Sequence, residues 1–194
     1  MSDPKQTRIA GLEALIRQQQ SAKGPPSVEK WNPPYCGDIG MEIRSDGTWY
    51  YQNSPIGRPA LVKLFASILR RDDDGRHYLV TPVEKIDVKV ADAPFLAVEM
   101  EQVGQGSEQT LVFRTNVDDI VSAGQAHPLR FVLEPAAGGL KPYVRVRGRL
   151  DALLTRALYV DLVELAVPMS SDAGNSEDEL GIWSGGTFFP LRVT

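Results

Sequence analysis

Apolar and polar residues recur along the chain with two different periods, and each period predicts a different kind of element. Within residues 5–22 an apolar residue recurs at the spacing of one helix face: Ile9, Leu12, Leu15 and Ile16. Gly24-Pro25-Pro26 then ends the pattern. We therefore expect an amphipathic helix that packs on the body of the protein or on a partner chain, with a regulatory helix as the alternative.

The stretch from Cys36 to Arg71 predicts a hairpin followed by a helix. Residues 41–44 and 48–51 contain β-forming side chains and flank Asp46-Gly47, a pair that strongly favours a hairpin turn. After Pro59, apolar residues follow the spacing of a helix face: Leu61, Leu64, Phe65, Ile68 and Leu69. Arg70 and Arg71 are expected at the carboxyl end of this helix, where positive charge is favourable.

A period of two dominates most of the chain after residue 77 and predicts strands with one polar face, which are typical of antiparallel sheets. We expect these strands at residues 78–81, 86–90, 96–101, 111–114, 130–133 and 143–147. A short helix is predicted around residues 117–122, and a second long helix from about Thr155 to Ala166. The acidic, Ser/Gly-rich loop 170–179 is expected to be disordered, and precedes a segment containing Trp183, Phe188 and Phe189.

Two parts of the chain carry a turn glycine, an arginine and the apolar residues of a helix in the same order. Gly37, Ile43, Trp49 and Arg58 correspond to Gly138, Val144, Leu150 and Arg156. We interpret this as a duplicated strand–turn–strand–helix unit, with chance agreement of apolar periods as the alternative.

The fold predicted from these patterns is α+β. It has two duplicated halves, each a mostly antiparallel sheet packed with one long helix. The predicted divisions are an amphipathic helix and linker at 1–24, an N-terminal repeat at 25–84 and a C-terminal repeat at 85–194.

Composition limits the function classes. The 194 residues can form one large core or two small domains, and 42% hydrophobic with 24% charged residues is ordinary for a globular protein. A net charge of −4 argues against nucleic acid as a partner. The amino-terminal residues lack the apolar region of a secretory leader, and no apolar run is long enough to span a membrane. One cysteine fits a reducing compartment, so a cytoplasmic location with no membrane partner is expected.

The densest positive charge falls on one predicted strand. Arg145, Arg147 and Arg149 occupy alternate positions, so their guanidinium groups are expected on one face, spaced about 6.5–7 Å apart. Guanidinium forks match phosphate and carboxylate groups, so this ladder predicts an anion-binding surface. The alternative is pairing with Asp and Glu across the sheet.

Three more residues are candidates for ligand binding. Arg58 precedes a predicted helix amino end, where it could hold an anion or pair with the Asp46-Gly47 turn. Trp49 and Tyr51 belong to an aromatic strand, and one of its faces could line a groove and cover a ligand; core packing is the alternative.

No motif specifies a reaction. Cys36 has no histidine near it in sequence, the acidic run 72–74 lacks the spacing of a calcium loop, and no zinc, dinucleotide or Walker motif occurs. We therefore predict no catalytic residue, no metal and no cofactor.

Nine sequence segments resemble a bacterial family known as domain of unknown function 1285. They are Cys36-Gly37-Asp38-Ile39-Gly40-Met41, Asp46-Gly47-x-Trp49-x-Tyr51, Pro55-Ile56-x-Arg58, Tyr78-Leu79-Val80-Thr81-Pro82, Thr115-Asn116, His127-Pro128-Leu129, Arg145-Val146-Arg147, Tyr159 and Gly181-Ile182-Trp183-Ser184. The resemblance implies a duplicated two-domain architecture whose second domain is superficially like a pleckstrin-homology fold. It also implies a cleft between the domains for a nucleotide-like ligand, and a signalling role.

The leading functional hypothesis is a non-catalytic ligand-binding or signalling module. A small anionic ligand, such as a nucleotide, would lie between the halves, bound by Arg58, Arg145 and Arg147 and covered by Trp49 or Tyr51. One alternative is a protein–protein interaction scaffold, with a homo-oligomer or another protein as partner. The other is a hydrolase or transferase acting on a phosphorylated small molecule.

Overall fold

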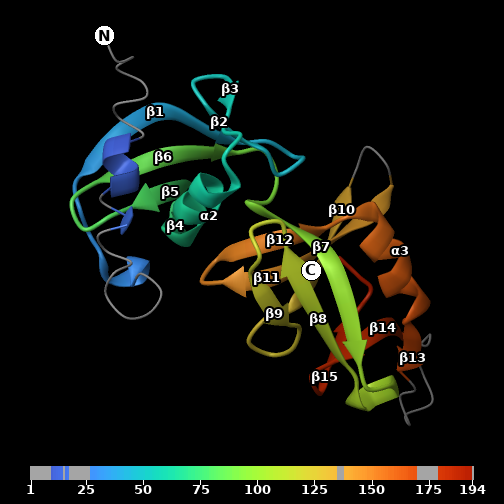
Figure 1. Ribbon diagram of the computed structural model, residues 1–194. Coiled ribbons are helices and arrows are strands. Elements are labelled where there is room, and N and C mark those ends of the chain that lie inside the picture. The colour runs from blue at the N-terminus through green and yellow to red at the C-terminus, as the bar shows by residue number, and fades with distance from the viewer. Residues whose placement is uncertain (1–9, 15, 18–26, 135–137, 170–178, 194) are drawn as a thin grey trace. The chain divides into compact units, whose positions relative to one another are not determined.

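The computed structural model describes residues 10–14, 16–17, 27–134, 138–169 and 179–193 (Figure 1). The chain divides into two units, Met1–Asp92 and Ala93–Thr194. The division follows Asp92 rather than residue 84, because the strand Lys85–Val90 pairs with strands of the first unit. Of the predicted loop 170–179, only Glu179 lies within the described residues.

Unit 1 is built on a six-stranded sheet in the order β3-β2-β1-β6-β5-β4. Its elements are η1 (Val28–Lys30), β1 (Tyr35–Ile43), β2 (Trp49–Tyr51), β3 (Ser54–Pro55), α2 (Pro59–Ser67), β4 (Leu69–Arg71), β5 (His77–Val80) and β6 (Lys85–Val90). The predicted hairpin is confirmed as β1 and β2, with Ile43 opposite Trp49. Residues 10–14 and 16–17 of the predicted first helix are helical, and they bury Leu12 and Ile16.

Unit 2 contains a second six-stranded sheet, in the order β10-β11-β12-β7-β8-β9, and a three-stranded sheet, β13-β14-β15. Its elements are β7 (Phe95–Val103), η2 (Gly106–Glu108), β8 (Thr110–Thr115), β9 (Ile120–Ser122), β10 (Leu129–Glu134), β11 (Gly139–Arg147), β12 (Leu150–Leu154), α3 (Arg156–Glu164), β13 (Val167–Met169), β14 (Glu179–Ser184) and β15 (Thr187–Pro190). Among the described residues no helix is long and apolar enough to cross a membrane.

The two large sheets have the same topology. In each, the first and sixth strands are parallel neighbours at the centre, and the other neighbours are antiparallel. The predicted α+β fold with two similar halves is therefore confirmed, although each large sheet is accompanied by a helix of only nine residues, α2 or α3.

The two segments aligned from the sequence occupy different positions in these sheets. β1 and β2 are the first and second strands of unit 1, whereas β11 and β12 are the fifth and sixth strands of unit 2. The shared pattern encodes a hairpin followed by a helix, and this local signal does not determine where the hairpin joins a sheet.

Two predicted helical stretches form strands instead. The helix after Pro59 ends at Ser67, and Leu69–Arg71 pairs with β5 as β4. Residues 117–122 form a turn and β9, with Asp118 in the left-handed region at φ 66°. In both places a short turn brings the segment against a neighbouring strand, and the ladder of backbone hydrogen bonds overrides the helical period.

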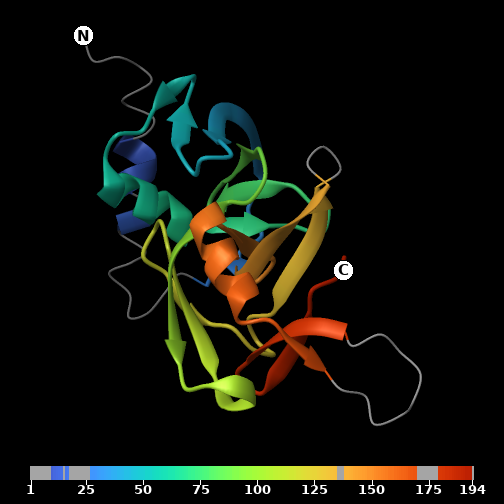
Figure 2. The same ribbon diagram turned by 90° about the vertical axis from the view of Figure 1, so that its right-hand side faces the viewer.

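The small sheet of unit 2 is joined to the large sheet through a buried serine. Ser184 Oγ accepts a hydrogen bond from the Leu111 N–H (2.9 Å) and donates one to the Ala123 carbonyl (2.8 Å). The Gly185 N–H donates to the Gln109 carbonyl at 3.0 Å. These bonds hold β14 beside η2 and β8 (Figure 2).

Candidate functional site

One face of the unit 1 sheet carries a row of polar side chains that crosses four strands. The register places Arg70 of β4 opposite Tyr78 of β5, Tyr78 opposite Asp87 of β6, and Asp87 opposite Asp38 of β1. The neighbouring apolar residues, such as Leu79, point to the other face because side chains alternate along a strand. We call these four residues the polar row.

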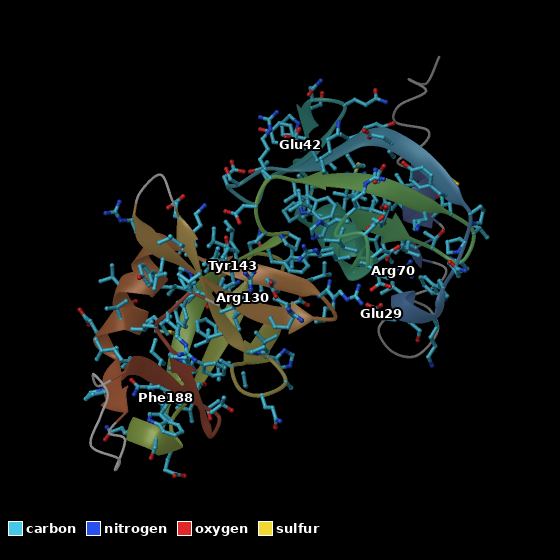
Figure 3. All side chains as sticks on the ribbon, turned by 180° about the vertical axis from the view of Figure 1, so that it is seen from behind. Glu29, Glu42, Arg70, Arg130, Tyr143 and Phe188 are labelled. Atoms are coloured by element: carbon cyan, nitrogen blue, oxygen red, sulfur yellow. The ribbon has the colours of Figure 1, made fainter. Side chains whose placement is uncertain are left out.

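The Arg70 end of the polar row is closed by the backbone of the preceding segment. Arg70 is buried, and its Nη1 donates to the carbonyls of Val28 and Trp31, both at 2.7 Å. In Figure 3 Arg70 lies near Glu29, which belongs to η1. Its Nε and Nη2 bind both carboxylate oxygens of Asp72, at 2.6 and 3.2 Å, and Lys85 Nζ lies 3.1 Å from the same carboxylate. Burial works to raise the pKa of Asp72, but these hydrogen bonds outweigh it and hold the pKa below its usual value.

Tyr78 is the next member of the row and is also buried. Its hydroxyl donates to Asp74 Oδ2 at 2.6 Å, and this bond lowers the pKa of Asp74. Burial, together with the carboxylate of Asp74, raises the pKa of Tyr78 to about 12. The hydroxyl therefore stays protonated as a donor throughout the neutral range.

The raised pKa of Tyr78 predicts a loss of stability in alkali. The folded-state pKa is about 12 and the ordinary value is about 10, so this contribution is complete below pH 10 and is lost as pH rises through 12. We expect the urea midpoint of the wild-type chain to fall more steeply between about pH 9 and 12 than that of Tyr78→Phe. Equal slopes for the two proteins would contradict a raised tyrosine pKa.

At its other end the polar row opens into a pocket of about 310 Å³ within unit 1. Two cations and two carboxylates line this pocket: Arg76, Lys89, Asp38 and Asp87. Asp87 is the buried member, with 8% of its side chain exposed, and its Oδ2 accepts bonds from Arg76 Nη2 and from the Tyr35 hydroxyl. The rest of the wall is supplied by Gly75, His77, Val88 and Val90.

The second ion pair in the pocket, between Lys89 and Asp38, depends on an irregular part of β1. The pairing of β1 with β6 shifts register on both sides of Asp38, and Gly37 and Gly40 there have φ values of 87° and 83°. The Gly40 N–H donates to Asp38 Oδ1 at 2.7 Å, which lowers the pKa of Asp38. Lys89 Nζ lies 3.2 Å from Asp38 Oδ2. The irregular backbone of β1 thus holds the Asp38 carboxylate beside the buried Asp87.

The aromatic residues predicted to cover a ligand lie in the core of unit 1. Trp49 is 1% exposed, and its ring centroid is 6.2 Å from that of Phe65. Tyr51 is 6% exposed, and its hydroxyl accepts a bond from Gln52 Nε2 at 3.2 Å. The indole N–H of Trp49 has no acceptor among the described residues. Neither ring offers a wide exposed face.

Arg58 occupies the N-cap position of α2, as its place in the sequence predicts. Its side chain is exposed, and Nη2 lies 3.1 Å from Glu13 Oε2 in the first helix. Asp46, the other partner considered for it, instead accepts a bond from the Thr48 N–H.

The predicted ladder of three arginines on one face of β11 is interrupted in unit 2, because the pairing of β11 with β12 shifts register between Arg145 and Arg147. Arg145 Nε donates to Asp151 at 2.5 Å and its Nη1 to the Gly148 carbonyl at 2.9 Å. Arg147 Nη1 donates to Asp119 at 2.5 Å, and its Cζ lies 5.0 Å from the ring centroid of Phe95. Arg149 falls in the turn after β11, so the expected ladder of three on one face does not form.

The pocket of unit 1 was missed by sequence reasoning. Its charged residues come from β1, β6 and the turn before β5, and only the strand register brings them together. The alternation of Lys85, Asp87 and Lys89 was a signal for a charged face, but it gave no indication of the partners. Among the described residues no group of histidine, cysteine and carboxylate side chains could hold a metal ion.

Comparisons with known proteins match both halves of the chain. The N-terminal domain of the family described as domain of unknown function (DUF1285) matches residues 25–93, and its C-terminal domain, described as protein of unknown function (DUF1285), matches residues 94–191. The crystal structure of a DUF1285 family protein from Silicibacter pomeroyi DSS-3 is 48% identical, with a TM-score of 0.81, over 94% of this chain and 95% of that one. A second, from Shewanella baltica OS155, is 30% identical with a TM-score of 0.51, over 65% and 91%. No curated protein matches the chain.

Proposed function

The chain belongs to the DUF1285 family, and from the geometry of unit 1 we propose that it is a non-catalytic module that binds a small ligand through an anionic group. The pocket lined by Arg76 and Lys89 is the observation that carries this proposal. In a signalling role, the occupied pocket would be the state that a protein partner recognises.

The exposure of the two pocket cations favours ligand binding. Their side chains are 56% exposed for Arg76 and 73% for Lys89, so a ligand can reach both from solvent. The Lys89–Asp38 pair is exposed at both ends and contributes little to stability. A guanidinium has five N–H donors, so Arg76 can keep its bond to Asp87 while it binds an incoming carboxylate or phosphate. The pocket volume lies at the lower end of the range for small-molecule sites.

The anionic ligand predicted from the sequence is retained, but we assign it to different residues. Arg145 is bound to Asp151 and to a backbone carbonyl, and Arg147 is bound to Asp119 while it covers Phe95. An anion would have to displace these contacts. Arg76 and Lys89 can bind one without rearrangement of the core.

The experiment is a thermal-shift screen of the full chain with phosphorylated and carboxylated metabolites at millimolar concentration. A ligand at about 100 times its dissociation constant stabilises the folded state by about 2.7 kcal/mol. We expect Lys89→Glu to abolish the shift, and Lys63→Glu, on an exposed position of α2, to preserve it. An absence of stabilisation by every ligand, or equal stabilisation of both variants, would contradict the proposal.

A further inference from the structure

The charges that line the unit 1 pocket are balanced in pairs. Arg76 binds Asp87, and Lys89 binds Asp38. Both members of each pair line the same pocket. The pocket therefore presents two positive and two negative groups to a ligand, rather than a surface of one sign.

This balance affects which ligands the pocket accepts. A purely anionic ligand that draws Arg76 or Lys89 toward itself weakens the bond of that cation to its carboxylate. The effect matters most at Asp87, because a buried carboxylate that loses its positive partner carries a large desolvation cost. A ligand that also brings a positive group compensates the carboxylates at the same time.

The carboxylates have acceptor capacity for such a group. Arg76 and the Tyr35 hydroxyl both bind Asp87 at Oδ2, and among the described residues no donor reaches its Oδ1. Asp38 uses Oδ1 for the Gly40 N–H, and among the described residues its Oδ2 meets the ammonium group of Lys89 alone, at 3.2 Å. Each carboxylate therefore retains lone pairs for an ammonium donor.

We propose that this pocket binds a small zwitterion, a molecule with one ammonium and one carboxylate group such as a free amino acid. Its carboxylate is bound by Arg76 and Lys89, and its ammonium by Asp87 and Asp38. The inference rests on the proposed function and narrows its ligand class, because a nucleotide carries several negative charges and no ammonium. The pocket, of about 310 Å³, is of a size for such a small molecule.

The test uses the full chain and three matched series of probes: the free amino acids, their N-acetyl derivatives, which keep only the anion, and their amides, which keep only the cation. Affinities are measured by titration calorimetry. We expect at least one free amino acid to bind, with its N-acetyl and amide forms weaker by about tenfold or more. Lys89→Glu should abolish this binding.

Variants of the carboxylates separate ammonium recognition from general effects on the fold. We expect Asp87→Asn to lower the affinity for the free amino acid about tenfold and to raise the affinity for its N-acetyl form. The reason is that Arg76, without its carboxylate partner, then favours an anion. Asp38→Asn, at a more exposed carboxylate, should change affinities in the same directions if Asp87→Asn fails to fold. Asp73→Asn, in the exposed turn before β5, is the control and should change neither the affinity for the amino acid nor that for its N-acetyl form.

The outcomes distinguish this inference from the proposed function. One outcome is that N-acetyl forms, nucleotides or phosphate bind at least as tightly as every free amino acid, and that this binding depends on Lys89. It would overturn the inference of a zwitterionic ligand and leave the proposal of an anion-binding module. Binding of no probe in any series, with no nucleotide or phosphate bound either, would overturn both. Binding of amides alone would also overturn both.

Discussion

Replacing Arg70 by methionine is expected to lower the free energy of unfolding of unit 1 by about 3 kcal/mol. The buried guanidinium holds the carbonyls of Val28 and Trp31 and both oxygens of Asp72. Methionine fills a similar volume but donates no hydrogen bond. The variant therefore removes the hydrogen-bond donor of the Val28 and Trp31 carbonyls and of the Asp72 carboxylate. The remaining contact of Lys85 with Asp72 compensates for this loss only in part.

Hydrogen exchange of the full chain, followed by mass spectrometry, measures this effect separately in each unit. Protection of the β4–β6 amides should fall in Arg70→Met, while protection of β7, β8 and β12 stays unchanged. Arg71→Met is the matched control, because Arg71 is exposed and, within the described part of the chain, bonds through Nε to the Gly75 carbonyl alone. This substitution should cost less than about 0.5 kcal/mol. Equal losses in the two variants would refute the role assigned to Arg70.

Truncating Phe65 to alanine is expected to cost about 3–5 kcal/mol, because it removes a fully buried ring from the contact between α2 and the sheet. The cavity would lie against Trp49, whose ring is tilted by 33° toward that of Phe65. Leucine at this position keeps part of the volume and should cost less than half as much as alanine.

Urea denaturation of the full chain, monitored by tryptophan fluorescence, measures this loss of stability, since Trp49 is buried beside Phe65. Lys63→Ala is the control on the exposed side of α2 and should leave the midpoint nearly unchanged, because alanine is a good helix former. A Phe65→Ala midpoint close to that of the control would show that the ring does not contribute to the core in this way.

Local patterns predicted those elements whose form depends on neighbouring residues. The Asp46-Gly47 hairpin and the helix that begins after Thr155 are examples. The failures occurred where pairing with the neighbouring strand across a short turn decides the structure. Leu69 fits the helical period of α2, but its segment joins β5, and residues 117–122 join β8 for the same reason. A single period in sequence does not distinguish these outcomes.

The candidate site was harder to predict than the fold. Tyr51 was considered as one wall of a ligand site because a strand has two faces, and the sequence alone does not show which is buried. The spacing of Arg145, Arg147 and Arg149 in the sequence predicts an anion-binding surface, whereas the partner that Arg145 binds, Asp151, belongs to the next strand. Asp38 and Asp87 meet only through the parallel register of β1 and β6, which no local pattern encodes.

The central position of the first and last strands in each sheet has a kinetic consequence. Tyr35 pairs with Lys85 in unit 1, and Phe95 with Ala152 in unit 2, so each sheet closes through contacts between residues far apart in the chain. During synthesis on the ribosome, neither sheet can form its parallel centre until its sixth strand has emerged. Closure of such long loops is entropically costly, so each unit should fold slowly for its size and in a single late step.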